Sequence, residues 1–287
     1  MKKELIAHRD PKSPIAELFR TLRTNIQFMS SQKASKVFLI TSTMPGEGKS
    51  WVSSNLAVTF AQAGKRVALV DCDMRKGRLH KIFQIDSVPG LSNYLSGIDE
   101  MGRIQNADVT NYLKRTEVNN LYIIPAGNVP PNPSELLASE VTNNMLEQLK
   151  ENFDIIILDG TPCLLVTDSI ILSRMADATI IVTAHKVTKK DGLEKTKKMI
   201  ENVGGKIVGV VLNKVPVNIQ KYKSTYYYSS QDVKSARPSE FNVENSSKTN
   251  NKVAFEIDNS NYNITKDKTD DIIKQLDEYL KQNKNNW

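Results

Sequence analysis

One eight-residue segment has the composition and spacing of a phosphate-binding loop. It reads TMPGEGKS, a Walker A motif in which Thr43 replaces the usual first glycine, and it lies between an apolar run and a helical pattern. Gly46 and Gly48 allow backbone N–H groups to approach phosphates closely, and the helix that begins near Lys49 adds its positive end. Lys49 can then reach the β- and γ-phosphates, and the Ser50 hydroxyl can ligate magnesium. The surrounding strand and helix argue against a chance match.

Three aspartates end apolar runs elsewhere in the chain. Asp71 and Asp73 close the run VALVDCD, and Asp159 closes the run IIILD. A magnesium–nucleotide site needs hard oxygen ligands, and phosphoryl transfer to a hydroxyl also needs a proton acceptor. We predict that Asp159, as the Walker B residue, and Asp73 serve the metal with Ser50, and that Asp71 is the general base. A single aspartate at a strand end commonly caps a turn, but three beside a phosphate loop favour a catalytic site.

The elements that must position these residues alternate along the chain. Continuous apolar runs separated by amphipathic segments predict an α/β fold with a mostly parallel, doubly wound sheet that binds ligands at the carboxyl ends of its strands. The predicted strands are 37–41, 67–71, 121–124, 155–159, 179–183 and 207–212. The predicted helices are 13–32, 49–63, 134–150, 168–175 and 189–202.

Length and composition restrict the class of protein. A chain of 287 residues can bury one substantial core. No run reaches the roughly 20 apolar residues of a membrane-spanning helix, and the first residues lack the apolar stretch of a signal peptide, so we expect a cytoplasmic protein. The net charge of +7 comes from dispersed lysines, which favours solvated helix faces over nucleic-acid binding. Cys72 and Cys163 show no metal-site or disulfide spacing and are predicted to be reduced packing residues.

The chain divides into a domain and a tail. We predict that residues 1–230 form the nucleotide-binding domain and that residues 231–287 form a polar, largely disordered tail, because the tail is rich in Ser, Asn and Lys. One short helix is expected within the tail, after the capping candidate Thr269. Its apolar stripe would consist of Ile272, Ile273, Leu276, Tyr279 and Leu280.

A cluster of tyrosines lies directly after the last predicted strand. It comprises Tyr222, Tyr226, Tyr227 and Tyr228. Three adjacent side chains cannot all face one core, so an accessible segment is expected. Taken alone, an ordinary amphipathic loop would be the better interpretation. Beside the family motifs described next, a phosphoryl acceptor is the better interpretation, and each phosphate would add about −1.5 to −2 charges.

Several further motifs make the sequence resemble the bacterial tyrosine kinases of capsule and exopolysaccharide systems, the CpsD/CapB type, from about residue 13 to 230. The segment ELFRTLR carries Glu17, Arg20 and Arg23 at the spacing of an ExxRxxR helix that family members use in subunit contacts. Residues 71–75 match the motif called Walker A′. The segments GLSNYLSG, PAGNVPPNPSELL and VLNK, at 90–97, 125–137 and 211–214, are also family-like.

The resemblance implies a P-loop NTPase of MinD/ParA-like architecture that uses ATP and Mg²⁺ to phosphorylate tyrosines, including its own cluster, with Lys49, Asp71 and Asp73 as catalytic residues. It implies a role in regulating capsule or exopolysaccharide synthesis and export. It further implies a membrane-anchored activator, or chain-length adaptor, that recruits the kinase to the inner face of the plasma membrane. Neighbouring subunits in a homo-oligomeric ring would phosphorylate one another, and other proteins would supply further tyrosine substrates.

The predicted nucleotide site is the phosphate loop with its flanks. Its members are Thr43, Met44, Pro45, Gly46, Glu47, Gly48, Lys49, Ser50, Trp51 and Asn213. The sequence departs from the family pattern in three places. Gly77 stands where the family usually has proline, Asp-Gly-Thr-Pro at 159–162 replaces the usual Asp-Thr-Pro-Pro, and the tail extends past residue 230.

Two other functions share the phosphate loop. One is a MinD/ParA-type ATPase switch without tyrosine kinase activity, whose loop carries an extra signature lysine that Met44 replaces here and a glycine that Pro45 replaces. The other is a regulatory module that binds nucleotide only to signal to a polymer-export complex. The tyrosine cluster favours the kinase over both.

Overall fold

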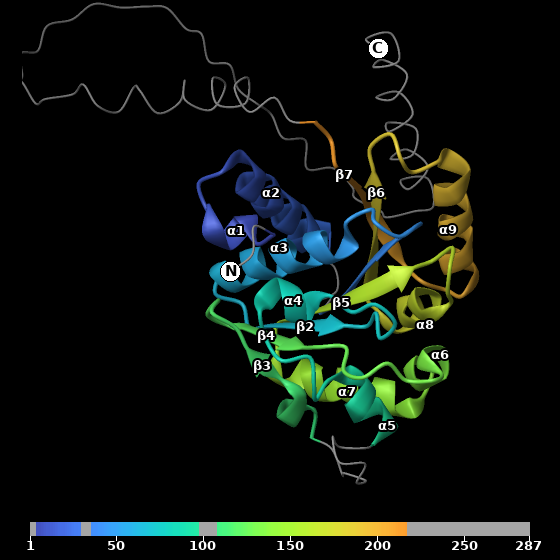
Figure 1. Ribbon diagram of the computed structural model, residues 1–287. Coiled ribbons are helices and arrows are strands. Elements are labelled where there is room, and N and C mark those ends of the chain that lie inside the picture. Colours follow the sequence, from blue (N-terminus) through green and yellow to red (C-terminus); the bar gives the residue numbers. More distant parts are fainter. Residues whose placement is uncertain (1–3, 30–35, 98–107, 217–287) are drawn as a thin grey trace, which may run out of the picture. The chain divides into compact units, whose positions relative to one another are not determined.

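A seven-stranded sheet forms the centre of the described unit, as the computed structural model in Figure 1 shows. The structure describes residues 4–29, 36–97 and 108–216, all within one unit that ends at Pro216. The predicted boundary at residue 230, the tail with its short helix and the whole tyrosine cluster lie outside the described residues.

The sheet is parallel except at one edge, and its strand order is β3-β4-β2-β5-β1-β6-β7. Its parallel strands are β1 (Val37–Ser42), β2 (Val67–Asp71), β4 (Leu121–Ile124), β5 (Ile155–Pro162), β6 (Ala178–Ala184) and β7 (Ile207–Asn213). The short strand β3 (Lys114–Arg115) pairs antiparallel with β4. The predicted doubly wound, mostly parallel sheet is therefore confirmed.

Helices cover both faces of the sheet (Figure 1). On one face lie α1 (Ile6–Arg9), α2 (Pro14–Met29), α3 (Lys49–Gln62) and α4 (Leu79–Phe83). On the other face lie α5 (Leu91–Ser96), the 3₁₀ helix η1 (Val109–Tyr112), α7 (Glu140–Asn152) and α8 (Asp168–Met175). Helix α6 (Pro133–Leu137) contacts α5, α7 and α8, and α9 (Lys190–Asn202) contacts α8 and β7. Among the described residues, no helix has the length and apolar character needed to cross a membrane.

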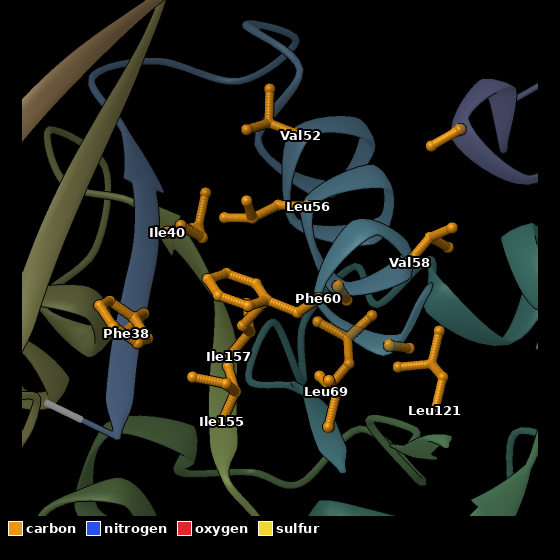
Figure 2. Close-up of a cluster of buried hydrophobic side chains, with 14 of the residues drawn as sticks. Phe38, Ile40, Val52, Leu56, Val58, Phe60, Leu69, Leu121, Ile155 and Ile157 are labelled. Carbon is orange, nitrogen blue, oxygen red and sulfur yellow. The ribbon is translucent and has the colours of Figure 1, made fainter. Parts of the chain in front are cut away.

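Helix α3 is the centre of the first core. Figure 2 shows Phe60 of α3 beside Phe38 of β1, with ring centroids 6.3 Å apart, and Ile157 of β5 nearby. Nearly the whole of α3 is buried because α1 and α2 cover the side that faces away from the sheet. The helix that follows the phosphate loop is thus held from two sides, which restrains Lys49 at its first turn.

The helix prediction missed the short helices α1, α4, α5 and η1, and it joined α6 to α7. Residues 134–150 do not form a single helix, because the chain breaks between α6 and α7, where Ser139 has an extended backbone. The Ser139 hydroxyl donates to the carbonyl of Leu136 at 2.7 Å, so a local side-chain bond competes with the helical one. Helix α1 was not predicted. Its Ala7 amide donates to the side chain of Asn55 on α3, a long-range contact that local periodicity does not reveal.

Candidate active site

The phosphate loop joins the end of β1 to the start of α3. Gly46 and Gly48 have φ values of 81° and 99°, in the left-handed region that favours glycine. A Cβ atom on Gly48 would lie 2.0 Å from the Nδ2 atom of Asn213, so a side chain at this position would displace the Asn213 amide. The amides of Gly46, Glu47 and Gly48 donate to no group among the described residues. These donors can bind phosphate oxygens.

The remaining predicted nucleotide-binding residues have other contacts. The amides of Thr43 and Met44 donate to the Glu47 carboxylate at 2.7 and 2.9 Å, so they are already paired. The Trp51 ring packs edge-on against Phe19 of α2, with centroids 5.0 Å apart. Only the backbone of Trp51 can therefore face a phosphate from this position. The Asn213 side chain, at the end of β7, donates to the carbonyl of Glu47 at 2.9 Å.

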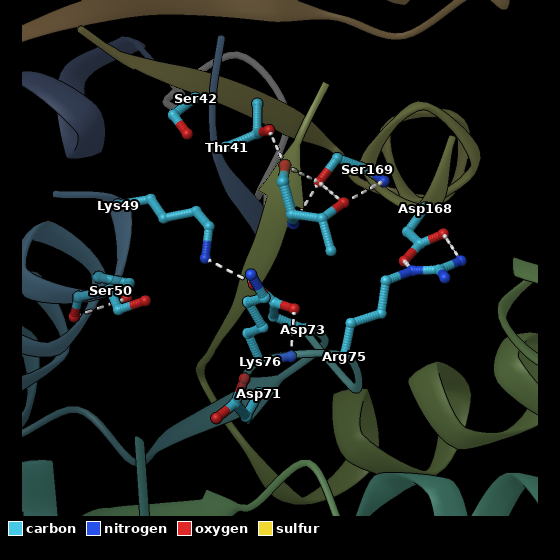
Figure 3. A network of polar contacts seen from close by, with 12 residues as sticks. Thr41, Ser42, Lys49, Ser50, Asp71, Asp73, Arg75, Lys76, Asp168 and Ser169 are labelled. Carbon is cyan, nitrogen blue, oxygen red and sulfur yellow. Dashed lines mark hydrogen bonds and ion pairs between the residues drawn. The ribbon is translucent and has the colours of Figure 1, made fainter. Parts of the chain in front are cut away.

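Lys49 is directed toward Asp73, as Figure 3 shows. Its Nζ atom lies 3.0 Å from Oδ2 of Asp73, and both side chains are largely buried. Burial by itself would lower the pKa of Lys49, but the charges of Asp159 and Asp73 more than reverse this and raise it. Lys49 is therefore a fixed positive charge beside the open amides of the loop.

Asp71 and Asp159 are direct neighbours across β2 and β5, and both side chains are fully buried. Oδ2 of Asp71 accepts the amide of Leu79 at 2.9 Å, whereas Oδ1 of Asp71 and both carboxylate oxygens of Asp159 have no hydrogen-bond partner among the described residues. Burial raises the pKa of Asp71 to about 8, and the nearby Asp159 adds to this effect. Burial also raises the pKa of Asp159, against the opposing effects of the Lys49 charge and of the neighbouring Ser50 and Ser53 hydroxyls.

The two unpaired oxygens of Asp159 fit a hard divalent cation, and the unpaired Oδ1 atom of Asp71 leaves that carboxylate able to accept a proton. The oxygens of Asp73 are different, because Oδ2 binds Lys49 and Oδ1 accepts the amide of Lys76 at 2.9 Å. No three His, Cys, Asp or Glu side chains form a metal cage within the part of the chain that the structure describes. This donor set suits Mg²⁺, which usually takes one or two carboxylates together with phosphates and water. The roles predicted for Asp71 and Asp73 stay predictions.

A second polar cluster, which the sequence did not reveal, lies beside the first. The guanidinium of Arg75 donates from Nε and Nη2 to the two oxygens of Asp168, at 3.0 and 3.2 Å (Figure 3). Asp168 is fully buried at the start of α8, and the Ser134 hydroxyl of α6 donates to it at 2.6 Å. These bonds tie the segment that carries Asp73 to two neighbouring elements. The position of Arg75, two residues after Asp73 in the Walker A′ segment, was the available signal.

Both departures from the family pattern within the described residues are glycines in close contact. A Cβ atom on Gly77 would lie 2.5 Å from Cβ of Ala126 and 2.9 Å from Oδ2 of Asp71. A Cβ atom on Gly160 would lie 2.3 Å from Oγ of Ser169. Gly77 lets the chain approach the Asp71 carboxylate, and Gly160 lets β5 approach Ser169 of α8.

The predicted subunit-contact residues have partners inside the chain. Arg20 forms an ion pair with Glu17 at 2.6 Å and also donates to the carbonyl of Pro11. Nη1 of Arg23 donates to the carbonyl of Thr59 at 2.9 Å and so joins α2 to α3. A role in subunit contacts stays a prediction, and Arg23 additionally has a structural contact.

The two cysteines are free and buried, as predicted. Burial raises the pKa of Cys72 well above its ordinary value and that of Cys163 to about 11. Both thiols are therefore protonated packing groups at neutral pH.

Comparison with known proteins identifies the family. A model of the AAA domain family matches residues 35–210. The putative tyrosine-protein kinase CapB of Staphylococcus aureus is 38% identical, and the match covers 79% of this chain and 96% of that protein. The tyrosine-protein kinase YwqD of Bacillus subtilis is 34% identical, over 81% of this chain and 94% of that protein. The chain belongs to the bacterial tyrosine-protein kinase family.

Solved structures agree with this membership of the tyrosine kinase family. The crystal structure of the chimerical protein CapA2B2 has a TM-score of 0.69 at 38% identity, and covers 76% of this chain and 92% of that one. The kinase domain of Escherichia coli tyrosine kinase ETK has a TM-score of 0.67 at 28% identity, covering 74% and 82%.

The cell division ATPase MinD of Pyrococcus furiosus shares the fold. Its TM-score is 0.52 at 23% identity, and the match covers 64% of this chain and 75% of that one. A likeness at this identity shows the P-loop architecture alone. The closer sequence relatives therefore favour the tyrosine kinase over the MinD/ParA-type switch.

Proposed function

We propose that the chain is an autophosphorylating protein-tyrosine kinase that regulates capsule or exopolysaccharide synthesis and export. One observation carries the proposal: Lys49, beside the open amides of the phosphate loop, lies at the same edge of the sheet as the carboxylates of Asp71 and Asp159, which keep oxygens without a hydrogen-bond partner. A triphosphate and a hydroxyl acceptor both need this combination of fixed positive charge and carboxylate. The family membership supports tyrosine as the acceptor.

The proposed mechanism assigns each step to a residue of this chain. The amides of Gly46 to Gly48 and Nζ of Lys49 bind the phosphates and stabilise the charge that develops during transfer. Ser50, Asp159 and Asp73 would hold Mg²⁺, which neutralises negative charge on the β- and γ-phosphates when bound. The phenol of tyrosine has a pKa of about 10 and arrives protonated. Asp71 orients this hydroxyl and, in its ionised form, accepts the proton.

The proposed acceptors are Tyr222, Tyr226, Tyr227 and Tyr228, together with tyrosines of other proteins. The cluster begins six residues after Pro216, where the described unit ends, so it is close in sequence to β7 and Asn213. A second copy of the chain in a ring would receive the transfer through contacts that include Glu17, Arg20 and Arg23. We further propose a cytoplasmic protein that a membrane-anchored activator recruits to the inner face of the membrane, with no nucleic-acid partner.

The test is to incubate the purified protein with Mg-ATP and to measure phosphotyrosine and released inorganic phosphate in parallel. A kinase yields phosphotyrosine, which mass spectrometry would place in the cluster, and a variant with phenylalanine at all four positions would lose that signal. Release of inorganic phosphate without phosphotyrosine, in the presence of the activator as well, would contradict the proposal and favour an ATPase switch.

A further inference from the structure

The carboxylate of Glu47 is buried inside the phosphate loop. Its residue is only 1% exposed, although it lies one position before Gly48 in a loop whose ligands are anions. Oε2 accepts the amides of Thr43 and Met44, at 2.7 and 2.9 Å. Oε1 accepts the hydroxyl of Thr43 at 2.8 Å and also the hydroxyl of Thr188. The carboxylate therefore receives four hydrogen bonds and needs all of them to offset its burial.

Glu47 also connects three segments at the carboxyl edge of the sheet. Thr188 lies between β6 and α9, and its hydroxyl accepts the amide of Ala184 at 2.8 Å while it donates to Glu47. Asn213, the last residue of β7, donates to the Glu47 carbonyl at 2.9 Å. Side chain and backbone of one residue thus tie the phosphate loop to the ends of β6 and β7.

This arrangement divides the backbone donors of the loop into two groups. The amides of Thr43 and Met44 donate to the Glu47 carboxylate. The amides of Gly46, Glu47 and Gly48 have no such acceptor and remain open to a ligand. Donors that already converge on a fixed anion keep the start of the loop ordered when no ligand is bound. A loop ordered in advance loses less conformational entropy when phosphate binds to its other donors.

We propose that Glu47 is a positioning residue that holds the phosphate loop in its binding shape before nucleotide arrives, with Thr188 as its anchor on the neighbouring segment. The proposal rests on the proposed function only in taking the ligand of the loop to be a nucleoside polyphosphate. It does not require that tyrosine be the acceptor, so nucleotide binding and loop order can test it separately from kinase activity.

The design uses four variants and one control. Glu47→Ala removes all four hydrogen bonds. Glu47→Gln restores them, because its amide oxygen can accept the two backbone N–H groups and its amide nitrogen can donate to the two hydroxyls. Thr188→Val removes the anchor to Glu47 and also the acceptor of the Ala184 amide, whereas Thr188→Ser keeps a hydroxyl for both bonds. Glu151→Ala, an exposed residue at the end of α7, controls for the loss of a surface carboxylate.

Two readouts separate positioning from general stability. Calorimetric titration with ADP gives the affinity for nucleotide. Hydrogen exchange of the nucleotide-free protein reports local opening at the amides of Thr43 and Met44, with the amide of Leu39 in β1 as the reference. We expect Glu47→Ala to bind ADP about tenfold more weakly or worse, and to exchange faster at the two loop amides while Leu39 is unchanged. Glu47→Gln should keep wild-type affinity within about threefold, and Thr188→Val should lie between the two. In turnover assays, the KM for ATP should rise by a larger factor than kcat falls.

Equal ADP affinity and unchanged loop exchange in Glu47→Ala would overturn the inference. If Glu47→Ala does not fold, the same decision falls to Thr188→Val: wild-type affinity and exchange in that variant would overturn the anchor and the proposal with it. Failure of the wild type to bind ADP would count instead against the proposed function, since the loop would then have no nucleotide to position.

Discussion

The Nζ atom of Lys49 lies 3.0 Å from the Oδ2 atom of Asp73, and this ion pair joins the phosphate loop to the Walker A′ segment. Asp71, at the end of β2, pairs in register with Asp159 of β5. The lysine and the carboxylates come from parts of the sequence far apart, and parallel strand order brings their ends to one edge. Single substitutions at these positions can separate their contributions to nucleotide binding from their contributions to phosphoryl transfer.

Neutralising Asp159 should reduce nucleotide affinity, whereas neutralising Asp71 should reduce the rate of transfer to tyrosine. Asp159→Asn is expected to weaken Mg-ATP binding, because it removes a carboxylate with two unpaired oxygens. Asp71→Asn is expected to keep nucleotide affinity while transfer to tyrosine falls about 100-fold or more, as expected for loss of a general base. The measurement is nucleotide affinity against phosphotyrosine yield in both variants. If Asp71→Asn loses nucleotide as severely as Asp159→Asn, Asp71 is a metal ligand and the base is another group.

The free energy of unfolding of the metal- and nucleotide-free protein should depend on pH through the titration of Asp71. The pKa of Asp71 is about 8 in the folded protein, whereas the ordinary value of 3.8 applies in the unfolded chain. Between these two pH values the folded state therefore keeps a proton that the unfolded chain has released. The stabilising contribution is full below about pH 4 and is lost as pH rises to about 8. Urea unfolding in EDTA should give a lower free energy of unfolding at pH 8.5 than at pH 6. Asp71→Asn should reduce that difference, and an equal pH dependence in the variant would refute this assignment.

Arg75 should hold Asp73 in place through Asp168. Arg75→Ala leaves the buried Asp168 carboxylate with the Ser134 hydroxyl alone, and should cost about 2 kcal/mol of stability, reduced from a fully buried pair because Arg75 is partly exposed. Arg75→Lys keeps the charge but loses the two-point contact. Ser134→Ala should cost about 1 kcal/mol. Thermal unfolding and phosphotyrosine yield are the measurements; full activity in Arg75→Ala would show that Asp73 needs no such support.

Much of the site at the carboxyl edge of the sheet was predictable, because short sequence patterns mark its residues. The phosphate loop and the aspartates after β2 and β5 lie at strand ends, and continuous apolar runs mark those strands. The contacts that were missed join distant residues: Arg75 to Asp168, Glu47 to Thr188, and Asn55 to Ala7. No periodicity encodes which side chains meet across loops. The break between α6 and α7 was missed because a single Ser139 side chain ends a pattern that is apolar on both sides of it.

The two arginines of α2 should both support assembly but differ in their effect on stability. We expect unphosphorylated protein to form the larger oligomer and the phosphorylated form to be smaller, because phosphates on neighbouring tyrosines repel one another. Arg20→Ala should shrink the oligomer with little loss of stability, since its partner Glu17 is partly exposed. Arg23→Ala should also lower stability by about 1 kcal/mol, through the lost bond to Thr59. Light scattering and thermal unfolding test this, and one mass for all forms would exclude these subunit contacts.

The most direct measurement of the central claim is phosphotyrosine formation by the wild type and by Lys49→Met, each incubated with Mg-ATP and, in parallel, with the activator. Methionine keeps the length of the side chain but removes the charge that faces the phosphates. We expect phosphotyrosine in the wild type and at least about a 100-fold lower rate in Lys49→Met, with thermal unfolding that shows a folded variant. Phosphotyrosine at the wild-type level in a folded Lys49→Met protein would contradict the account, because transfer would then not use the phosphate loop.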